Sequence, residues 1–169
     1  MNLFDLNSDN IVMNIDGKDI EMKHPICYDK VINKWLVSKC GKVWSLAQNK
    51  MLSDRVRKGD VYIKHCISTT TDFWKDGSGR RVDNFNLIRR DILQHKLVID
   101  TWAPLYDNPP KGISWEQWEI VRKLDTVYNH ISKTVCIDHI DDNPENNHVD
   151  NLRRVTQWDN QKTRKAKGI

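Results

Sequence analysis

The stretch "VCIDHIDDNPENNHVDNLRRVTQWDN", residues 135–160, concentrates carboxylates, two histidines and five asparagines between short apolar runs. Each of these polar groups costs free energy when it is buried without a partner. A surface loop would explain the composition, but the order of the residues points to a defined site. "TVCID" alternates like a strand that presents Asp138 and His139 at its end, and "LRRVT" returns as a second short strand.

A helix is predicted directly after the second strand. Thr156 and Asp159 form a T-x-x-D box, which marks Thr156 as the N-cap and places Asn160 in the first turn. The stretch therefore predicts strand, loop, strand and helix, with an Asp-His pair at one end and an asparagine at the other. Because successive strand side chains point to opposite faces, Asp138 and His139 can reach one phosphate only if the strand ends or twists there.

The stretch resembles the motif of the HNH nucleases with the ββα-metal fold, and among them the phage homing endonucleases. Their pattern, D-H-x-D-x-N-x-x-N-N-x-x-x-N-L-R-x-V-T-x-x-x-N, is matched by "DHIDDNPENNHVDNLRRVTQWDN". Asp142 stands where the family prefers glycine, a departure that concerns the turn. Upstream, "WLVSKCGKVWSLAQNKMLS" is similar to the β-rich module that precedes HNH in these enzymes, and "HKLVIDTWAP" is similar to their H-R-L-V-A-x-x-F segment.

The resemblance implies roles for the residues of the motif. Asp138 and Asn160 would ligate one Mg²⁺ or Mn²⁺ ion per site, and oxygen ligands with only two protein contacts suit Mg²⁺, which keeps waters and takes phosphate oxygens. His139 would act as the general base, a task that suits an imidazole at neutral pH. Asn151, the central asparagine, would contribute to the catalytic site by bracing the loop.

Other polar residues are expected to support the site. Asn147, together with Asn146, is expected to tie the turn through hydrogen bonds from side chain to backbone. His95 matches a family position near the site and is assigned a supporting role. His148 stands where the family tolerates apolar residues, so a structural or exposed role is expected for it.

The distribution of charge favours a nucleic-acid partner. The chain has a net charge of +4, but residues 1–30 hold three lysines against six acidic residues, whereas residues 153–169 hold six Lys and Arg against one. Such a basic run is often only a solvated tail, yet beside a dense polar site it indicates phosphate contacts with double-stranded DNA. The predicted DNA contacts are Arg153, Arg154, Lys162, Arg164 and Lys165. Since Arg153 and Arg154 alternate on a strand, one is expected to pack or pair while the other faces phosphate.

The predicted fold class is α+β, with a small N-terminal β-rich module followed by a ββα-metal HNH motif that contains an inserted helix. Residues 1–32 form an acidic segment whose "IVMNI" could pair as a strand. Residues 33–91 form the β-rich module, which could bind DNA, with a hairpin around Gly41, a third strand in 60–69 and a glycine-rich turn in 74–84. Residues 92–169 form the nuclease domain with its basic tail.

Two helices are predicted in the nuclease domain before the motif. The first covers about residues 92–102 and is ended by Pro104. The second, the inserted helix, covers about residues 114–131, where Ser114 and Gln117 make a capping box. Trp115 and Trp118 follow its apolar spacing and are expected to be core anchors.

Length and composition limit the class of protein. A chain of 169 residues with 38% apolar content can bury a core, and no apolar run approaches the roughly 20 residues of a membrane span. No secretory signal is expected from "MNLFDLNSDN", so the expected compartment is the cytoplasm, that of the host cell if the chain is phage-encoded. The four cysteines stand apart without a C-x-x-C pair and are expected to be reduced thiols.

Three functions remain open from the sequence. The leading prediction is a metal-dependent HNH endonuclease that hydrolyses DNA phosphodiesters, by nicking or by double-strand cleavage, of the homing type. The alternative is a DNA-binding module that keeps the fold without catalysis, although a module without catalysis would have no reason to keep Asp138, His139 and Asn160 together. A zinc-stabilised interaction domain is the third, and it would require distant Cys and His residues to converge.

Overall fold

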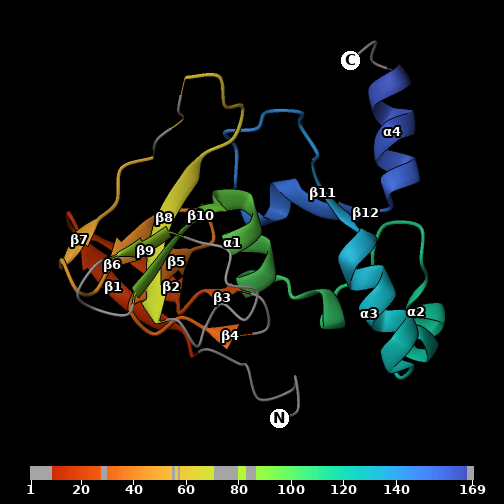
Figure 1. Ribbon diagram of the computed structural model, residues 1–169, viewed down its shortest axis with the longest axis horizontal. Coiled ribbons are helices and arrows are strands. Elements are labelled where there is room, and N and C mark those ends of the chain that lie inside the picture. The colour runs from red at the N-terminus through yellow and green to blue at the C-terminus, as the bar shows by residue number, and fades with distance from the viewer. Residues whose placement is uncertain are drawn as a thin grey trace.

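The computed structural model describes residues 9–27, 30–54, 56, 58–70, 80–82 and 87–166. Antiparallel sheets and short helices make up the chain, which confirms the α+β class (Figure 1). Most of the glycine-rich turn predicted in 74–84 lies outside the described residues. The elements are β1 (Ile11–Ile15), β2 (Lys18–Lys23), β3 (Ile26–Cys27), β4 (Lys30–Val31), β5 (Trp35–Ser38), β6 (Val43–Ser45), β7 (Lys50–Met51), β8 (Lys64–Thr70), β9 (Arg80–Val82), β10 (Leu87–Leu93), α1 (Gln94–Trp102), η3 (Leu105–Asp107), α2 (Trp115–Val121), α3 (Asp125–Thr134), β11 (Cys136–His139), η4 (Val149–Asn151), β12 (Leu152–Val155) and α4 (Gln157–Ala166).

Two sheets form the N-terminal part of the molecule. The larger has five strands in the order β1-β2-β5-β6-β7, and the smaller has three in the order β8-β10-β9, with β3 and β4 as a separate pair. The apolar piece "IVMNI" is therefore a strand, as the sequence suggested. It belongs to the acidic N-terminal segment, which adds β1 and β2 to the sheet that β5, β6 and β7 continue.

The hairpin predicted around Gly41 is confirmed. Trp35 pairs with Ser45 and Val37 with Val43, and Gly41 adopts a φ of +88° in the turn. Ser38 closes the turn, because its hydroxyl accepts a hydrogen bond from the Lys42 amide at 2.9 Å. Glycine has no Cβ and takes this positive φ without steric cost.

Helix α1 lies between the two sheets on one side and the β11–β12 pair on the other (Figure 1). It begins at Gln94 rather than near residue 92, because Ile92 and Leu93 still pair with His65 and Lys64 in the three-stranded sheet. It ends at Trp102, just ahead of Pro104 as predicted, since a residue that precedes proline is disfavoured in the helical region.

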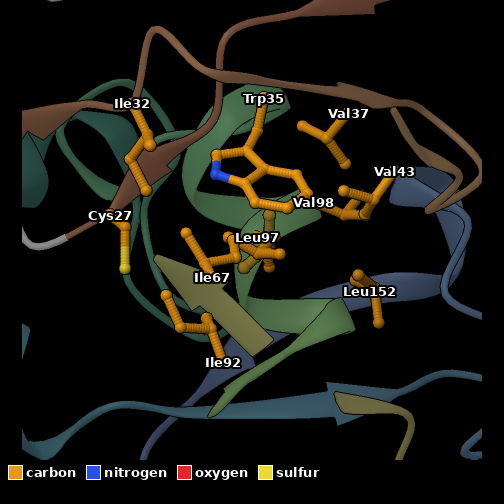
Figure 2. Packing of buried hydrophobic residues seen from close by; sticks show 11 residues of the cluster. Cys27, Ile32, Trp35, Val37, Val43, Ile67, Ile92, Leu97, Val98 and Leu152 are labelled. Atoms are coloured by element: carbon orange, nitrogen blue, oxygen red, sulfur yellow. The ribbon is translucent and has the colours of Figure 1, made fainter. Parts of the chain in front are cut away.

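The buried core surrounds α1 and joins the parts of the chain (Figure 2). Most of its members come from the two sheets, α1 and β12, and Cys27 of β3 and Ile32 after β4 join them, so the core includes residues on both sides of the domain boundary predicted at residue 91. They are Cys27, Ile32, Trp35, Val37, Val43, Ile67, Ile92, Leu97, Val98, Ile99 and Leu152. Leu152 of β12 packs among them, and this contact fastens the C-terminal unit to the sheets. Truncating one of the larger members to alanine typically costs about 2–5 kcal/mol.

The predicted strand, loop, strand and helix unit is confirmed in β11, β12 and α4. The two strands are antiparallel, and Asp138 pairs with Arg153 and His139 with Leu152. Thr156 caps α4 as predicted, because its hydroxyl accepts a hydrogen bond from the Asp159 amide at 3.1 Å. Helix α4 contacts β11 near its start and then extends away from the sheets (Figure 1).

The inserted segment is two helices, α2 and α3, and not the single helix predicted over 114–131. The Ser114–Gln117 capping box is present at the start of α2, as predicted. In one straight helix Tyr128 would lie about 15 Å along the axis from Trp118. Instead the two rings are 5.9 Å apart, because α3 folds back to pack against the fully buried Trp118. The chain turns at Arg122–Leu124, and burial of Trp118 overrides the helical periodicity of the sequence.

The prediction that Trp115 is a core anchor is wrong. Its side chain is 50% exposed, and Trp118 is the buried residue of α2. A helix of two turns that packs along one narrow line buries one large side chain, and the next tryptophan falls outside the contact. The described residues contain no helix long and apolar enough to cross a membrane.

Replacing Gly41 with alanine is expected to destabilise the fold by more than the conformational cost alone. A Cβ at Gly41 would lie 3.0 Å from Cδ of Gln94, in addition to the strain of φ +88°. Gly17 is the matched control, because it also has a positive φ, of +78°, and a Cβ there meets nothing within 4 Å. Urea unfolding should show a loss of about 1–2 kcal/mol for Gly17→Ala and a larger loss for Gly41→Ala. Equal losses would show that the contact with Gln94 carries no cost.

Candidate functional site

Asp138 and His139 lie at the end of β11, and their side chains lie on its opposite faces. Asp138 faces Arg153 on the neighbouring strand, whereas His139 is 7% exposed and turns toward α1 and the loop that follows it. The strand ends at His139, but His139 is still paired with Leu152, so the two side chains point to opposite faces of β11. That both side chains act on one phosphate stays a prediction.

His139 is held by a buried amide network. Its Nε2 lies 3.0 Å from Oδ1 of Asn147, whose Nδ2 donates to Oε1 of Gln94 at 2.6 Å. Gln94 in turn donates to the carbonyl oxygen of Gly41 and to the carboxylate of Asp54. The predicted hydrogen bonds between side chain and backbone are present but long, from Asn147 to the Glu145 carbonyl oxygen at 3.4 Å and from the His148 amide to Oδ1 of Asn146 at 3.5 Å. The shorter bonds of Asn147 join side chains.

Two aromatic rings line His139. The ring of Tyr62 stacks on it at a centroid distance of 6.0 Å, and the ring of His95 meets it edge-on at 5.3 Å. Burial, followed by the nearby His139, lowers the pKa of His95 from 6.5 to about 4, so His95 is neutral at neutral pH. Its Nδ1 is buried and has no hydrogen-bond partner among the described residues. His95 therefore packs against His139 as an uncharged ring at neutral pH.

Asp141 is the centre of the loop between the two strands. Its carboxylate accepts hydrogen bonds from the side chains of Asn146 and Asn151 and from the backbone amide of Asn143. These bonds, led by the one from Asn146, lower its pKa. Asn151 returns the contact, because its Oδ1 accepts from the Asp141 amide at 3.1 Å. Asn151 therefore closes the loop and touches neither Asp138 nor His139 through a hydrogen bond.

The turn tolerates aspartate at residue 142. Asp142 adopts a φ of +63°, which explains why the family prefers glycine there. Aspartate is among the few other residues that visit this region, because its short polar side chain can bond locally. Aspartate is thus accommodated at this position of the turn.

Asn160 lies in the first turn of α4, where its backbone amide donates to the carbonyl oxygen of Thr156 at 3.0 Å. Its half-buried side chain makes no hydrogen bond to any described residue. Asp138 is likewise only partly used. Arg153 donates twice to its Oδ2, at 2.7 and 2.8 Å, and its Oδ1 accepts nothing from the described residues.

The free carboxylate oxygen of Asp138 and the amide oxygen of Asn160 are of the kind that suits a hard cation. Carboxylate and amide oxygens are the ligands that Mg²⁺ takes, and Mg²⁺ commonly uses one or two protein groups together with waters and phosphate oxygens. The donor set of Asp138 and Asn160 fits such an ion. Within the described ranges, no three His, Cys, Asp or Glu side chains gather into a metal site, so the residues offer no zinc cluster.

The predicted DNA contacts differ in their surroundings. Arg154 is 6% exposed and bonds the carbonyl oxygens of Ile99 and Ala103 and the carboxylate of Asp100, at the end of α1. Its guanidinium is therefore engaged in hydrogen bonds within the protein. Arg153 is paired with Asp138 and keeps some exposure. Lys162 is exposed on α4, with its Nζ 5.2 Å from the ring of Trp158. Arg164 and Lys165 also belong to α4, and their side chains lie outside the described part.

His148 has a local role in the loop. Its Nδ1 accepts from the Asp150 amide at 3.3 Å and lies 3.5 Å from the Asp150 carboxylate. No hydrogen bond joins its ring to Gln94, Asn147 or His139, which are all described residues. These contacts match the structural role that was expected of it.

Three residues of the site were missed in the sequence. Asp141 had a signal, since it occupies a fixed place in the family motif. Gln94 and Tyr62 had none, because each meets His139 or its partner only through contacts between distant parts of the chain. Neither residue type is unusual in a helix start or a loop, so composition did not mark them.

Comparisons with known proteins give one distant likeness. No family model matches the chain, and no curated protein matches it. A solved structure of DNA binding and cleavage by the HNH homing endonuclease I-HmuI is similar to it, with 22% identity and a TM-score of 0.46. The match covers 79% of this chain and 53% of the other, so the chain spans about half the length of that protein.

The neutral, buried His95 makes stability depend on pH. Its pKa is about 4 in the folded chain and about 6.5 when unfolded, so between these values the unfolded chain binds the extra proton. Native stability should therefore fall as pH drops from about 6.5 to about 4. At about 1.4 kcal/mol per pKa unit, His95 accounts for up to about 3 kcal/mol of this loss.

Urea unfolding between pH 4 and 7 measures the effect in the wild type and in His95→Phe, which keeps an aromatic ring against His139. The variant should lose less stability toward pH 4. Some dependence should remain, because burial also lowers the pKa of His65. Parallel curves for the two proteins would contradict the assignment to His95.

Proposed function

We propose that this chain is a metal-dependent DNA endonuclease of the HNH type. The observation that supports it is the joint state of three residues. His139 is anchored on one side by Asn147, while Asp138 keeps one carboxylate oxygen and Asn160 its whole amide without a hydrogen bond to described residues. A histidine that is held in place, together with a carboxylate and an amide that keep unused polar atoms, is what a reaction site requires.

Phosphodiester hydrolysis has three chemical requirements. A water must lose a proton as it attacks, the charge that develops on the phosphate must be neutralised, and the leaving 3′-oxygen must be stabilised. In the proposal His139 accepts the proton from water. Asp138 and Asn160 hold one Mg²⁺ or Mn²⁺ ion, which when bound neutralises charge on the phosphate and the leaving oxygen. Arg153 orients Asp138 by occupying Oδ2, so that Oδ1 is the oxygen left for the ion.

DNA is the proposed substrate because the polyanion complements the basic C-terminal residues. Lys162 is exposed on the same helix as Asn160, and Arg164 and Lys165 follow it in the sequence. The alternative is a module that binds DNA without cutting it. Both share the fold and the charge, and they differ only in whether phosphodiester bonds break. The proposed enzyme is of the homing type, and it cleaves DNA either by nicking one strand or by cutting both.

Supercoiled plasmid incubated with the protein and either Mg²⁺ or EDTA separates the two functions. Nicked or linear product that requires Mg²⁺ supports the endonuclease. Asp138→Asn keeps an oxygen for Arg153 but removes the charge, and Asn160→Ala removes an amide with no bonded partner, so both should fold and bind DNA yet lose cleavage. Binding without cleavage by the wild type would favour the alternative, and full activity of both variants would refute the ligand assignment.

The two histidines of the motif should behave oppositely. His139→Ala should lower the single-turnover cleavage rate by about 10²–10⁴-fold, the usual share of a general base. His148→Ala is the matched control, because its contacts stay within the loop turn at Asp150, and it should keep most of the activity. Measuring both with saturating DNA decides between them, and the reverse pattern would overturn the alignment of the motif.

The basic end of the chain is tested by salt. Replacing Arg164, Lys165 and Lys167 with glutamine removes three charges without shortening α4. If each neutralises a phosphate, the slope of log K against log[salt] should shrink by up to about 0.9 per lost contact. Cleavage at saturating DNA should persist, and an unchanged slope would show that these residues do not contact the phosphates.

A further inference from the structure

Gln94 occupies the point where the N-terminal sheets meet the candidate site. It is the first residue of α1 and is 2% exposed. Its amide joins the turn at Gly41, the carboxylate of Asp54 and the side chain of Asn147. No part of the HNH resemblance assigns it a role. The partners of this buried amide determine the directions in which its nitrogen and its oxygen point.

The nitrogen of the Gln94 amide must face the N-terminal sheet. At 2.7 Å it meets the carbonyl oxygen of Gly41 and at 2.8 Å the carboxylate of Asp54, and both groups only accept hydrogen bonds. The His65 ring lies beside them, with Nε2 3.1 Å from the same nitrogen. A flipped amide would press its oxygen against two acceptors. Oε1 of Gln94 is therefore fixed toward Asn147.

The same reasoning orients Asn147 and then His139. Because Oε1 of Gln94 accepts, the group of Asn147 that meets it at 2.6 Å must be its NH₂. Oδ1 of Asn147 is then left facing Nε2 of His139 at 3.0 Å, and an amide oxygen can only accept. Nε2 of His139 must therefore carry a hydrogen.

We propose that Gln94 is a positioning residue that fixes the tautomer of His139 through Asn147. With the hydrogen on Nε2, the lone pair of the neutral ring is on Nδ1, which bonds to no described residue. This inference rests on the proposed function for its consequence, since Nδ1 becomes the atom that accepts the proton of water. The opposite tautomer would require both amides to flip and would place Oε1 of Gln94 against Gly41 and Asp54.

The glycine in the β5–β6 turn supports the same arrangement. A Cβ at Gly41 would lie 3.0 to 3.2 Å from the end of the Gln94 side chain. The turn can approach Gln94 closely only without a side chain, and its carbonyl oxygen then accepts the hydrogen bond that orients the amide. The turn of the N-terminal sheet thus orients Gln94, and through Asn147 it determines which nitrogen of His139 carries the hydrogen. His139 lies more than forty residues after Gln94 in the sequence.

The test reads the tautomer directly. In ¹⁵N NMR of the imidazole rings, a nitrogen with a hydrogen and one with a lone pair have well-separated shifts, and His139→Ala identifies the His139 signals by their loss. The wild type should show hydrogen on Nε2 and a lone pair on Nδ1 at a pH where the ring is neutral. In Gln94→Met, which keeps chain length without the amide, both nitrogens should shift toward the average of two tautomers.

Thr101→Val is the matched control. Thr101 is buried on the same helix, where its hydroxyl bonds the Ile26 amide and the Leu97 carbonyl oxygen, away from His139. It should lose stability as Gln94→Met does, yet leave the His139 signals unchanged. A wild-type spectrum with hydrogen on Nδ1 would overturn the inference even if no variant folds. So would a Gln94→Met spectrum that matches the wild type.

The rate of DNA cleavage provides a second, independent test. If the wild type cuts DNA, Gln94→Met should lower the single-turnover rate at saturating DNA on the order of 10- to 100-fold, as loss of an outer positioning partner does, with unchanged DNA affinity. A full rate would overturn the inference. If the wild type cuts nothing, the proposed function fails, and the tautomer measurement still decides the role of Gln94.

Discussion

Helix α1 is the part of the molecule on which the sheets and the ββα unit both depend. Leu97 and Val98 are fully buried between them, so the helix cannot shift without opening the core. Its two ends carry polar contacts in addition. Gln94 bonds the β5–β6 turn and the motif loop at one end, and Arg154 of β12 bonds the last carbonyl oxygens at the other. One helix thus positions both strands of the motif relative to the N-terminal sheets.

The local parts of the site could be predicted because their signals are local. The first strand of the motif, the T-x-x-D cap and the turn at Gly41 each depend on residues within a few positions of one another, and each is confirmed. The break of the inserted segment could not, because it follows from the packing of Trp118 against Tyr128. Gln94 and Tyr62 also could not, since what they contact near His139 is brought to them only by the tertiary fold.

The environment of His139 differs from that of an ordinary buried histidine. The ring has a hydrogen-bond partner on one nitrogen, aromatic rings of Tyr62 and His95 beside it, and little exposed surface. His95 lies at a similar depth, but its buried Nδ1 has no hydrogen-bond partner in the described part of the chain, and its pKa is lowered to about 4. The amide of Asn147 distinguishes the two, because its Oδ1 lies 3.0 Å from Nε2 of His139, whereas Nδ1 of His95 has no such partner among the described residues.

The pairing of Asp138 with Arg153 bears on how a cation would be held in the proposed enzyme. The guanidinium balances the single charge of Asp138, and Asn160 brings none, so the two proposed ligands and Arg153 together offer a divalent ion no net negative charge. Such a site would hold Mg²⁺ weakly by itself. A DNA phosphate supplies the missing charge and further oxygen ligands, which is how Mg²⁺ is commonly bound in phosphoryl-transfer sites. On this assignment ion and DNA stabilise each other's binding, because each carries the charge that the other needs.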